Sequence, residues 1–564
     1  MLRYRPSSIA EPWLFRSLAL CAWLLLGVTM IRWWAPAWGL AEPVGTASRA
    51  ESPPVPTIPC LSYAPFRRPG HTPFDPTLRL DDAQLREDLN LLKAWTPCIR
   101  LYGMGHGQER IPALAEEVGL QVVVGAWISR DREASRQELE AALAAAHAHP
   151  KVVRMIIVGN EVLLRQERSP EELAALIREA RSRSPVPVAY ADVWEFWLRH
   201  ARILAPEVDV VAVHVLPYWE DHPIARVHAV DHVVSIVQQV RLQLDHRPVW
   251  LAETGWPAAG RQRGPAVPGP REQALFVREL RHRLAAEQID YNLIEGFDQP
   301  WKRWLEGAMG GAWGILTAQG LPRDAKAQAL PVDPTARGAL MGAVLSGAGG
   351  LMLLSWWRRR HHRPPIGGDP SGWRTLGGAG LMGLMGLFWG AHLGQLAHWP
   401  RNLAEWAVAL ALLASALVVM GGAAWQAAQA IAAAPGSRGN EAAGRGWSRS
   451  VTVFLFLAAW QALQLVFDGR YRALPWEQVA APGVALVMAR ASGLALHFRP
   501  RDRLLASVLG AAALVLPIFE GLANTRALAL SGCWLVWALL VWTGPGLAAD
   551  ARASRTGPAR GAHG

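Results

Sequence analysis

Two hydrophobic patterns divide the chain. Between about residues 58 and 318, short runs rich in Val, Ile and Leu alternate with stretches whose apolar residues recur every three or four positions. The short runs are typical of buried strands, and the longer stretches of amphipathic helices. Eight strands alternating with helices predict an α/β fold, a (β/α)8 TIM barrel, over 58–330. The predicted strands lie at 58–64, 98–102, 121–126, 152–158, 186–191, 208–215, 248–252 and 291–297.

The second pattern begins after Pro334. Apolar residues fill stretches of about 20 positions there, which is the length that spans a bilayer. The barrel is therefore expected to be followed by an all-α polytopic transmembrane domain of about seven helices over 337–548, with the lipid bilayer as a partner. The candidate spans lie at 338–357, 376–398, 403–425, 451–467, 479–497, 504–522 and 527–547.

The distribution of charge supports a membrane orientation. The 57 Lys and Arg residues exceed the 46 Asp and Glu residues, which gives a net charge of +11. The arginines cluster in alternate loops between the spans, as the positive-inside rule predicts, and not on one face that would bind nucleic acid. We therefore expect a multi-pass protein of the inner cell membrane, with a cytoplasmic tail at 549–564 and the barrel on the periplasmic or extracytoplasmic side. The clusters are at 358–363, 438–449, 499–503 and 552–560.

Two segments of this membrane pattern leave alternatives open. Residues 1–16 are basic and predict a cytoplasmic N-terminus, and 17–39 contain an apolar run that suits a signal anchor or a signal peptide. Tryptophans at the end of this run favour a retained anchor, and a Pro/Ser/Ala-rich linker follows at 40–57. The other segment is the 479–497 span, which contains Arg490. This arginine either snorkels to the membrane surface or pairs with Glu405 or Glu520.

Two predicted strands end in a glutamate. IIVGNEVLLR at 156–165 contains Glu161, and VWLAETGWP at 249–257 contains Glu253. Burying a carboxylate at the end of a strand costs several kcal/mol if the group has no partner. A carboxylate at such a position therefore indicates a catalytic role. Glu161 and Glu253 are predicted at the C-terminal ends of the fourth and seventh strands, which meet at the mouth of a barrel. Two converging carboxylates are what hydrolysis of a glycosidic bond requires.

Several motifs together resemble the family 17 glycoside hydrolases, whose members act on β-1,3-glucans. VGNE (158–161) and ETGWP (253–257) carry the resemblance, and SYAPF (62–66), IRLYG (99–103), FDQPWK (297–302) and WGIL (313–316) extend it. The resemblance implies a retaining mechanism with Glu161 as acid/base and Glu253 as nucleophile. The plant enzymes usually carry an acidic residue in the FDQPWK motif, where this chain has Gln299 after Asp298.

The membrane tail is similar to a bacterial branch of this family that is associated with β-1,3/β-1,6-glucan formation. This resemblance implies a transglucosylase that cleaves β-1,3-glucan and branches it through β-1,6 linkages, with a glucan synthase or exporter as a candidate partner. Two alternatives remain open at this stage. One is an endo-β-1,3-glucanase that only hydrolyses, and the other is a non-catalytic glucan-binding component of an export machinery.

Further polar and aromatic residues lie near the predicted strand ends and are candidates for substrate binding. Arg100 is expected to keep the nucleophile ionised, and His214 and Tyr218 to hydrogen-bond Glu253. The Asn160 amide suits the sugar 2-hydroxyl or a neighbouring carboxylate, and tryptophans suit the apolar faces of sugar rings. For each of these the alternative is a satisfied residue of the barrel core. The full set is Tyr63, Arg100, Tyr102, Asn160, His214, Tyr218, Trp256, Asp298, Trp301 and Lys302, with Trp219 as a further stacking candidate.

The cysteines bear on the compartment of the barrel. Cys60 and Cys98 lie at matching positions in the first two predicted strands, so their sulfurs can meet if these strands are neighbours. A disulfide is expected there in an oxidising compartment, and two buried thiols are the alternative. No His, Cys and carboxylate cluster with metal spacing and no glycine-rich phosphate loop occurs in the sequence, so we expect no metal and no cofactor.

Overall fold

A computed structural model describes residue 24 and residues 56–323, 334–361, 371–396, 399–432, 441–491 and 498–544. These residues fall into two compact units, one containing 56–323 and the other 334–544. Each unit is described by itself. The predicted N-terminus 1–16, the anchor or signal segment apart from Leu24, most of the linker and the tail at 549–564 lie outside the described residues.

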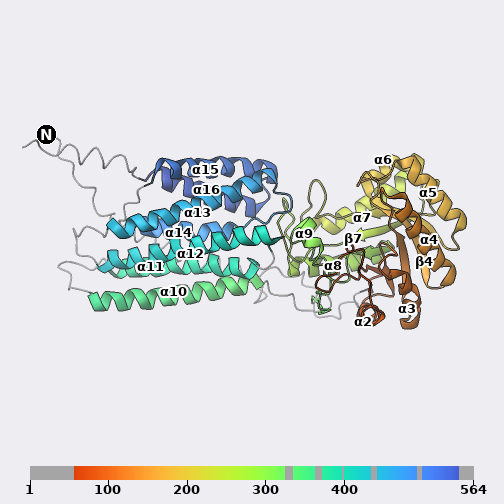
Figure 1. Cartoon of the computed structure of the whole chain (residues 1–564), viewed down its shortest axis with the longest axis horizontal. Coiled ribbons are helices and arrows are strands. Elements are labelled where there is room, and N and C mark those ends of the chain that lie inside the picture. The colour runs from red at the N-terminus through yellow and green to blue at the C-terminus, as the bar shows by residue number, and fades with distance from the viewer. Residues whose placement is uncertain are drawn as a thin grey trace, which may run out of the picture. The chain divides into compact units, whose positions relative to one another are not determined.

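The first unit is a closed barrel of eight parallel strands, each paired with its neighbours in chain order from β1 round to β8 (Figure 1). The predicted fold class is confirmed, because every predicted strand overlaps an observed one. The predicted runs at 58–64, 98–102, 208–215 and 291–297 are longer than the observed strands, whereas β4 and β7 are each one residue longer than predicted. The strands are β1 (Cys60–Ser62), β2 (Cys98–Arg100), β3 (Gln121–Ala126), β4 (Val153–Asn160), β5 (Val188–Val193), β6 (Val210–His214), β7 (Val249–Thr254) and β8 (Tyr291–Leu293).

Helices follow the strands and surround the barrel. Their ends carry the expected signals: Asp81 and Asp131 accept backbone hydrogen bonds as N-caps, Ser169 forms a capping box with Glu172, and α3 ends at Gly119 with a left-handed φ of 77°. The elements are α2 (Asp82–Lys93), η1 (Gln108–Arg110), α3 (Ile111–Val118), α4 (Arg132–Ala148), α5 (Pro170–Arg183), α6 (Trp194–Leu204), α7 (Arg226–Gln243), α8 (Pro270–Ala286) and α9 (Lys302–Glu306).

Alternation along the strands separates two cores. One core lies between the strands and the helices and includes Leu61, Ile99 and Val158, and the other contains Cys60, Cys98 and a set of residues at alternate strand positions. Because side chains of a strand point alternately to its two faces, the second core fills the barrel interior. Cys60 and Cys98 form a disulfide that joins β1 to β2. It closes a loop of 38 residues, for which the chain-entropy model gives about 4 kcal/mol of stabilisation.

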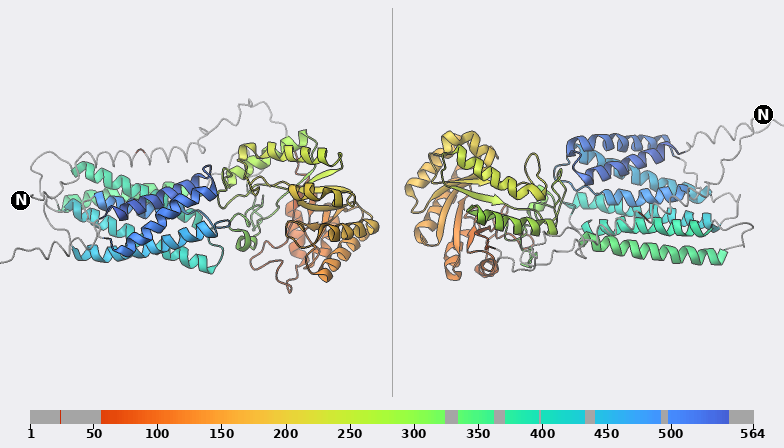
Figure 2. Two further views of the ribbon diagram at one scale, coloured as in Figure 1. Left: turned by 90° about the horizontal axis from the view of Figure 1, so that it is seen from above. Right: turned by 180° about the vertical axis from the view of Figure 1, so that it is seen from behind.

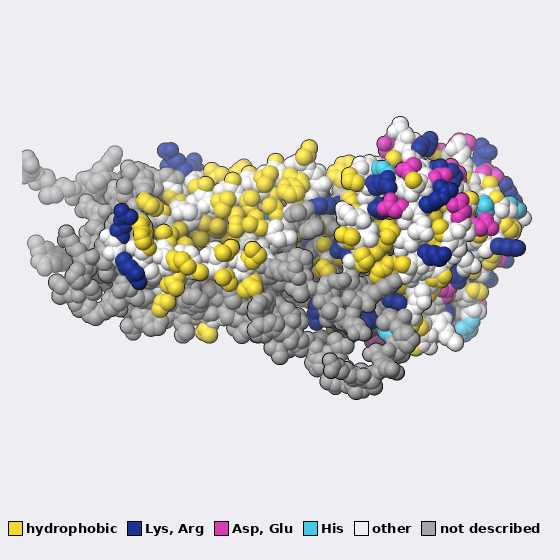
Figure 3. Space-filling view, turned by 90° about the horizontal axis from the view of Figure 1, so that it is seen from below, with side chains coloured by type: hydrophobic (Ala, Val, Ile, Leu, Met, Phe, Trp, Pro, Cys, Tyr) yellow, Lys and Arg dark blue, Asp and Glu magenta, His cyan; other side chains and the backbone are white. Residues whose placement is uncertain are grey.

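The second unit contains seven helices among the residues that the structure describes. The helices lie side by side as a bundle, in which α10 packs on α11, α14 on α11, α12 and α16, and α15 on α13 and α16 (Figures 1 and 2). Hydrophobic side chains cover much of the flank of this unit, and Lys and Arg gather at one end of it (Figure 3). The helices are α10 (Pro334–His361), α11 (Ser371–Leu396), α12 (Leu403–Ala432), α13 (Glu441–Phe467), α14 (Trp476–Ala491), α15 (Pro500–Glu520) and α16 (Thr525–Trp542).

Five of these helices are long and apolar enough to cross a membrane, within the part of the chain that the structure describes. They are α10, α12, α13, α15 and α16. The two others are α11, which is rich in glycine, and α14, which carries Pro482 and is described only to Ala491. The seven predicted segments thus all correspond to helices, and the number that cross a bilayer stays a prediction.

A row of glycines lets α10 and α11 approach each other closely. A Cβ atom added at Gly342 would collide with the carbonyl oxygen of Gly386, and one added at Gly390 would collide with that of Gly338. These pairs also show that the two helices run antiparallel. Spacing small residues four apart allows backbones of neighbouring helices to touch, which is a common way for membrane helices to associate.

Arg490 pairs with neither of the two glutamates considered from the sequence. Its guanidinium is exposed and donates to the backbone carbonyls of Leu540 and Thr543 and to the Thr543 hydroxyl, at the C-terminal end of α16. A cation there satisfies carbonyls that lack a helical partner. Glu405 accepts instead from Arg401 and Arg472.

Candidate active site

Glu161 is the first residue after β4 and has a left-handed backbone with a φ of 54°. Its N–H donates to the carbonyl of Ala191 on β5 at 2.8 Å, and its own carbonyl accepts from the N–H of Arg165 at 2.9 Å. The preceding Gly159 also has a positive φ, of 88°. The chain thus turns sharply as soon as the strand ends, which leaves the Glu161 side chain 25% exposed at the barrel mouth.

Glu253 lies within β7 and is almost completely buried, with 5% of its side chain exposed. The Arg100 guanidinium donates to Glu253 Oε1 at 2.9 Å and to the Ala252 carbonyl at the same distance. Arg100 also donates to Asn160 Oδ1. One guanidinium from β2 therefore connects the end of β4 with the end of β7, as the sequence predicted for its contact with the nucleophile candidate.

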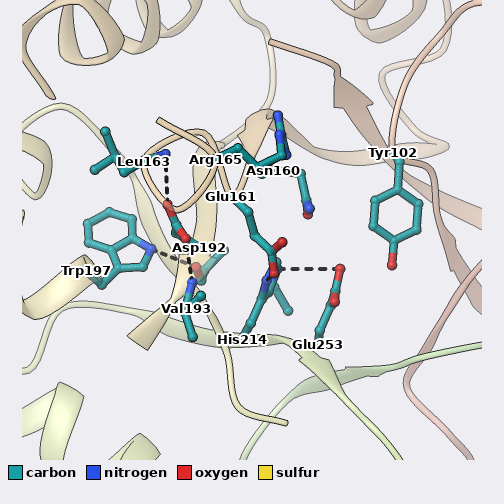
Figure 4. A network of polar contacts seen from close by, with 12 residues as sticks. Tyr102, Asn160, Glu161, Leu163, Arg165, Asp192, Val193, Trp197, His214 and Glu253 are labelled. Carbon is teal, nitrogen blue, oxygen red and sulfur yellow. Dashed lines mark hydrogen bonds and ion pairs between the residues drawn. The ribbon is translucent and has the colours of Figure 1, made fainter. Parts of the chain in front are cut away.

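His214 lies between the two glutamates, at the end of β6 (Figure 4). Its Nδ1 is 2.9 Å from Glu161 Oε1, and its Nε2 is 3.6 Å from Glu253 Oε1. One carboxylate oxygen of each glutamate and a His214 ring nitrogen all lie within 4.8 Å of one another. The two carboxylates that the sequence placed on different strands therefore converge.

The environment of Glu253 favours its charged form. Burial raises the pKa of this carboxyl, but electrostatic interactions with His214 and Arg100 and a hydrogen bond from Tyr102 outweigh burial, so the pKa lies below its usual value. The Tyr102 hydroxyl also lies 2.9 Å from Ser62 Oγ, and burial and the Glu253 charge hold its pKa well above the usual value. A carboxylate that stays ionised beside a neutral phenol suits a nucleophile.

Asp192 is a further buried carboxylate at the mouth, and the sequence analysis did not select it. Burial, opposed by a hydrogen bond from Tyr190 and reinforced by the Glu161 charge, raises its pKa to about 6. Its Oδ2 accepts from the Leu163 N–H at 3.3 Å, and the Tyr190 hydroxyl lies 3.1 Å from the same N–H (Figure 4). Asp192 therefore holds the turn that carries Glu161. It was detectable, because it follows a predicted strand as the two selected glutamates do.

Glu295 and Glu306 form a second acidic group that sequence reasoning missed. Burial raises the pKa of Glu295 to about 7, although the Lys302 ammonium 3.1 Å away opposes this shift. Burial also raises the pKa of Glu306, which interacts electrostatically with Lys302 and with both catalytic candidates. Glu295 lies inside the last predicted strand and not at its end, so it was not selected. Lys302 thus lies near the site, held by these carboxylates.

Four of the predicted substrate-binding residues do not line the mouth. Tyr63 is buried and donates to Asp88 on α2, outside the barrel. The Tyr218 hydroxyl donates its single proton to the Arg261 carbonyl and so does not donate to Glu253. Trp256 has no exposed face for stacking and donates to the Val267 carbonyl. Asp298 pairs with Arg323 and accepts from the Gly314 N–H.

Aromatic rings with exposed surface lie in loops after four strands, β1, β3, β6 and β8. Trp301 is partly exposed, donates to Gln299 Oε1 and packs edge-on against Phe74, which is 65% exposed. Trp219 is partly buried under the Arg263 guanidinium. Trp127 follows β3, is 39% exposed and lies 4.2 Å from the Arg165 guanidinium. Trp127 was missed because nothing in its local sequence distinguishes it from a core residue.

The same central residues are the ones that could hold a metal ion. Among the residues that the structure describes, Glu161, His214 and Glu253 bring three ligand atoms together. The guanidinium of Arg100 touches Glu253, however, and a second cation there would be repelled. The donor set fits a hydrogen-bonded acid pair better than a metal site.

A closed parallel barrel with two converging carboxylates, one buried and ionised and the other partly exposed, is the arrangement of a glycosidase. The comparisons with known proteins agree with this class. Residues 60–314 match the family model described as the BtgE/BtgC glycoside hydrolase domain. The match covers the barrel and supports a glycosidase.

Individual relatives and a solved structure match a little under half of the chain. A glucan 1,3-beta-glucosidase of Arthroderma benhamiae is 27% identical over 263 residues, which are 43% of this chain and 84% of the relative. A glucan 1,3-beta-glucosidase of Candida albicans is 26% identical over 279 residues, 44% of this chain and 89% of the relative. Among solved structures, a family 17 beta-1,3-glucanosyltransferase from Rhizomucor miehei is 23% identical with a TM-score of 0.42, covering 49% of this chain and 97% of that one.

Proposed function

We propose that the chain is a membrane-anchored retaining enzyme that cleaves β-1,3-glucan and transfers the cleaved segment to another glucan. One observation carries the proposal: carboxylate oxygens of Glu161 and Glu253 lie within 4.8 Å of each other. Retaining glycosidases have carboxyl groups about 5–5.5 Å apart, whereas inverting enzymes leave about 6.5–9.5 Å for a water molecule. The names of the curated relatives support β-1,3-glucan as the substrate.

In the proposed first step, a Glu253 oxygen attacks the anomeric carbon while Glu161 donates a proton to the leaving oxygen. The C–O bond to the leaving sugar breaks, and a covalent glycosyl-enzyme forms on Glu253. Arg100 and Tyr102 hold Glu253 in place and ionised. The more exposed Glu161 is suited to exchange protons with sugars that enter and leave the mouth.

In the second step, Glu161 takes a proton from an acceptor hydroxyl, and the acceptor oxygen displaces Glu253 from the anomeric carbon. A glucan acceptor gives transfer, and water gives hydrolysis. Arg100 fixes the Asn160 amide through its oxygen, which leaves the amide NH2 to donate to a sugar hydroxyl. Anchoring beside the bilayer supports transfer, because the enzyme would meet glucan as it is exported. We extend the proposal to β-1,6 branching and to a periplasmic barrel.

Product sizing with the purified full-length protein tests this function. Laminarihexaose is the substrate, and products are separated by length and by linkage. Longer products, some with β-1,6 linkages, are expected for transfer and branching. If only shorter products form, the enzyme hydrolyses glucan and does not transfer it. Unchanged substrate with the wild-type protein would contradict the enzymatic proposal and leave a glucan-binding role.

A further inference from the structure

The helical unit contains a cavity that polar side chains line in part. The cavity, of about 70 Å³, lies between the end of α11, the beginning of α12, the end of α13 and the segment that leads into α14. This volume is below the range of about 300–1,000 Å³ for drug-sized ligands, which limits the ligand to a small group. The polar and aromatic lining consists of His392, Trp399, Glu405, Gln461, Arg472 and Gln478.

Two lining residues have buried polar atoms that no described residue satisfies. His392 is 1% exposed, and neither of its ring nitrogens has a hydrogen-bond partner within the described chain. The side-chain oxygen of Gln461 is also buried and has no hydrogen-bond partner within the described chain. A buried polar atom without a partner costs about 1–3 kcal/mol, so it is expected to meet a water or a ligand. The Trp389 and Trp399 rings flank His392, with ring centroids 5.9 and 5.2 Å away.

The charges at this cavity balance one another. Glu405 accepts from Arg401 at 2.6 Å and from Arg472 at 2.7 Å, and Arg472 also pairs with Asp468 at 2.9 Å. Two guanidinium groups thus face two carboxylates. A site for a phosphate or a lipid headgroup would be expected to offer excess positive charge. The balance therefore favours a neutral ligand.

The remaining groups are suited to hydroxyls. A side-chain amide both donates and accepts, as a neutral imidazole does, and this is the pairing that vicinal hydroxyl groups require. Gln461, Gln464 and Gln478 supply three amides, of which Gln478 uses its NH2 on the Ala409 carbonyl. Trp399 adds an aromatic ring to the lining. Amides, an imidazole and an aromatic ring together match a sugar.

We propose that this cavity binds glucose units of a neutral glucan, as a second site separate from the catalytic residues. The choice of glucan rests on the function proposed for the barrel. The cavity opens at the end of the bundle where α10 begins, since Gly390 of α11 meets Gly338 there. The arginine-poor loops belong to this end, which the proposed topology places outside the cytoplasm. The helical unit would thus hold glucan as well as anchor the enzyme.

Titration calorimetry on the full-length Glu253→Gln protein in lipid nanodiscs tests the second site, with laminarihexaose as the ligand and turnover blocked. Two binding sites per chain are expected. His392→Ala and, separately, Gln461→Leu should weaken one site about tenfold or more, since each removes about one hydrogen bond of 1–3 kcal/mol. Ser531→Ala is the matched control, because Ser531 is buried in the same bundle outside the cavity and should keep both sites.

Other outcomes would overturn the second site. A single site in the Glu253→Gln protein, or two sites in both cavity variants, would mean that the cavity holds only water. If inorganic phosphate or glycerol phosphate binds and His392→Ala abolishes this binding, the cavity is a site for an anion and not for a sugar. The wild-type protein separates this failure from failure of the catalytic proposal. If it cleaves laminarihexaose while only one site is found, the cavity proposal alone is wrong.

Discussion

Glu161, the proposed acid/base residue, has an unfavourable backbone conformation. A left-handed conformation is uncommon for residues other than glycine and costs about 1–3 kcal/mol at functional sites. Its φ of 54° is maintained because contacts on both sides fix the turn. The Ala191 carbonyl holds the Glu161 N–H, and Asp192 and Tyr190 hold the N–H of Leu163. We infer that Asp192 positions the acid/base residue without touching the substrate.

Replacing Asp192 by asparagine is expected to lower kcat about 10- to 100-fold with little change in KM, because a small displacement of a catalytic group has effects of this size. One asparagine oxygen cannot replace both carboxylate oxygens, which accept from Leu163 on one side and Val193 on the other. Steady-state kinetics on laminarihexaose measure the effect. Asp209→Asn is the control, since Asp209 precedes β6 at the opposite end of the barrel. Equal losses in the two variants would contradict a positioning role.

The stability of this variant should also depend on pH. The pKa of Asp192 is about 6 in the folded protein, above its usual value of 3.8. The stabilising contribution of the carboxyl is therefore fully present below about pH 4 and is lost as the pH rises through 6. Asparagine has no proton to lose, so the Tm of Asp192→Asn relative to wild type should rise between pH 4 and pH 7. A constant difference would show that Asp192 does not titrate in this range.

The residue scale also shows what sequence reasoning can detect. A carboxylate at the end of an apolar run located Glu161 and Glu253, and the same rule applied throughout would have added Asp192, whereas Glu295 lies inside such a run. The orientation of side chains just beyond a strand is harder to predict. Tyr63 follows Ser62, whose hydroxyl bonds inside the barrel to Asn292, so strand alternation turns Tyr63 outward.

At the scale of elements, hydropathy predicted seven helices but could not show how they pack. The glycines of α11 lower its helix propensity and its apolar character, yet they allow α10 and α11 to approach each other closely. Their spacing of four is visible in the sequence as Gly386 and Gly390. The partner glycines on α10 could not be assigned, because facing helices are set by tertiary packing.

Replacing Gly386 by isoleucine should separate α10 from α11. A Cβ atom at this position would collide with the Gly342 carbonyl and with Ser346, both of them on the facing helix. The Tm of the full-length protein in detergent is expected to fall by several degrees. Gly349→Ile is the control, because a Cβ atom there meets nothing within 4 Å. A similar small change in both variants would contradict close packing of α10 on α11.

At the scale of the whole molecule, the chain combines a barrel that matches a glycoside hydrolase domain with a bundle that contains five helices long and apolar enough to cross a membrane, within the described residues. The repeated β–α pattern made the barrel predictable, since strands and helices alternate with few interruptions. The polar cavity of the bundle was not predictable, because its lining comes from separate helices with unremarkable local sequences.

Cysteine labelling tests the proposed membrane topology. In a background with Cys21 and Cys533 replaced by serine, Arg470→Cys places a thiol in the exposed loop before α14, and Arg359→Cys places one at the exposed end of α10. A membrane-impermeant maleimide should label position 470 in intact cells and position 359 only after permeabilisation. The reverse pattern would put the barrel in the cytoplasm.

The most direct test of the account is to trap the sugar on its nucleophile. The wild-type protein is treated with a 2-deoxy-2-fluoro-β-laminaribiosyl fluoride, whose glycosyl-enzyme hydrolyses slowly, and its peptides are analysed by mass spectrometry. A retaining mechanism predicts one added disaccharide on the peptide that contains Glu253, and none in Glu253→Gln. An adduct on Glu161, or none on a wild-type protein that still cleaves laminarihexaose, would contradict the assigned roles.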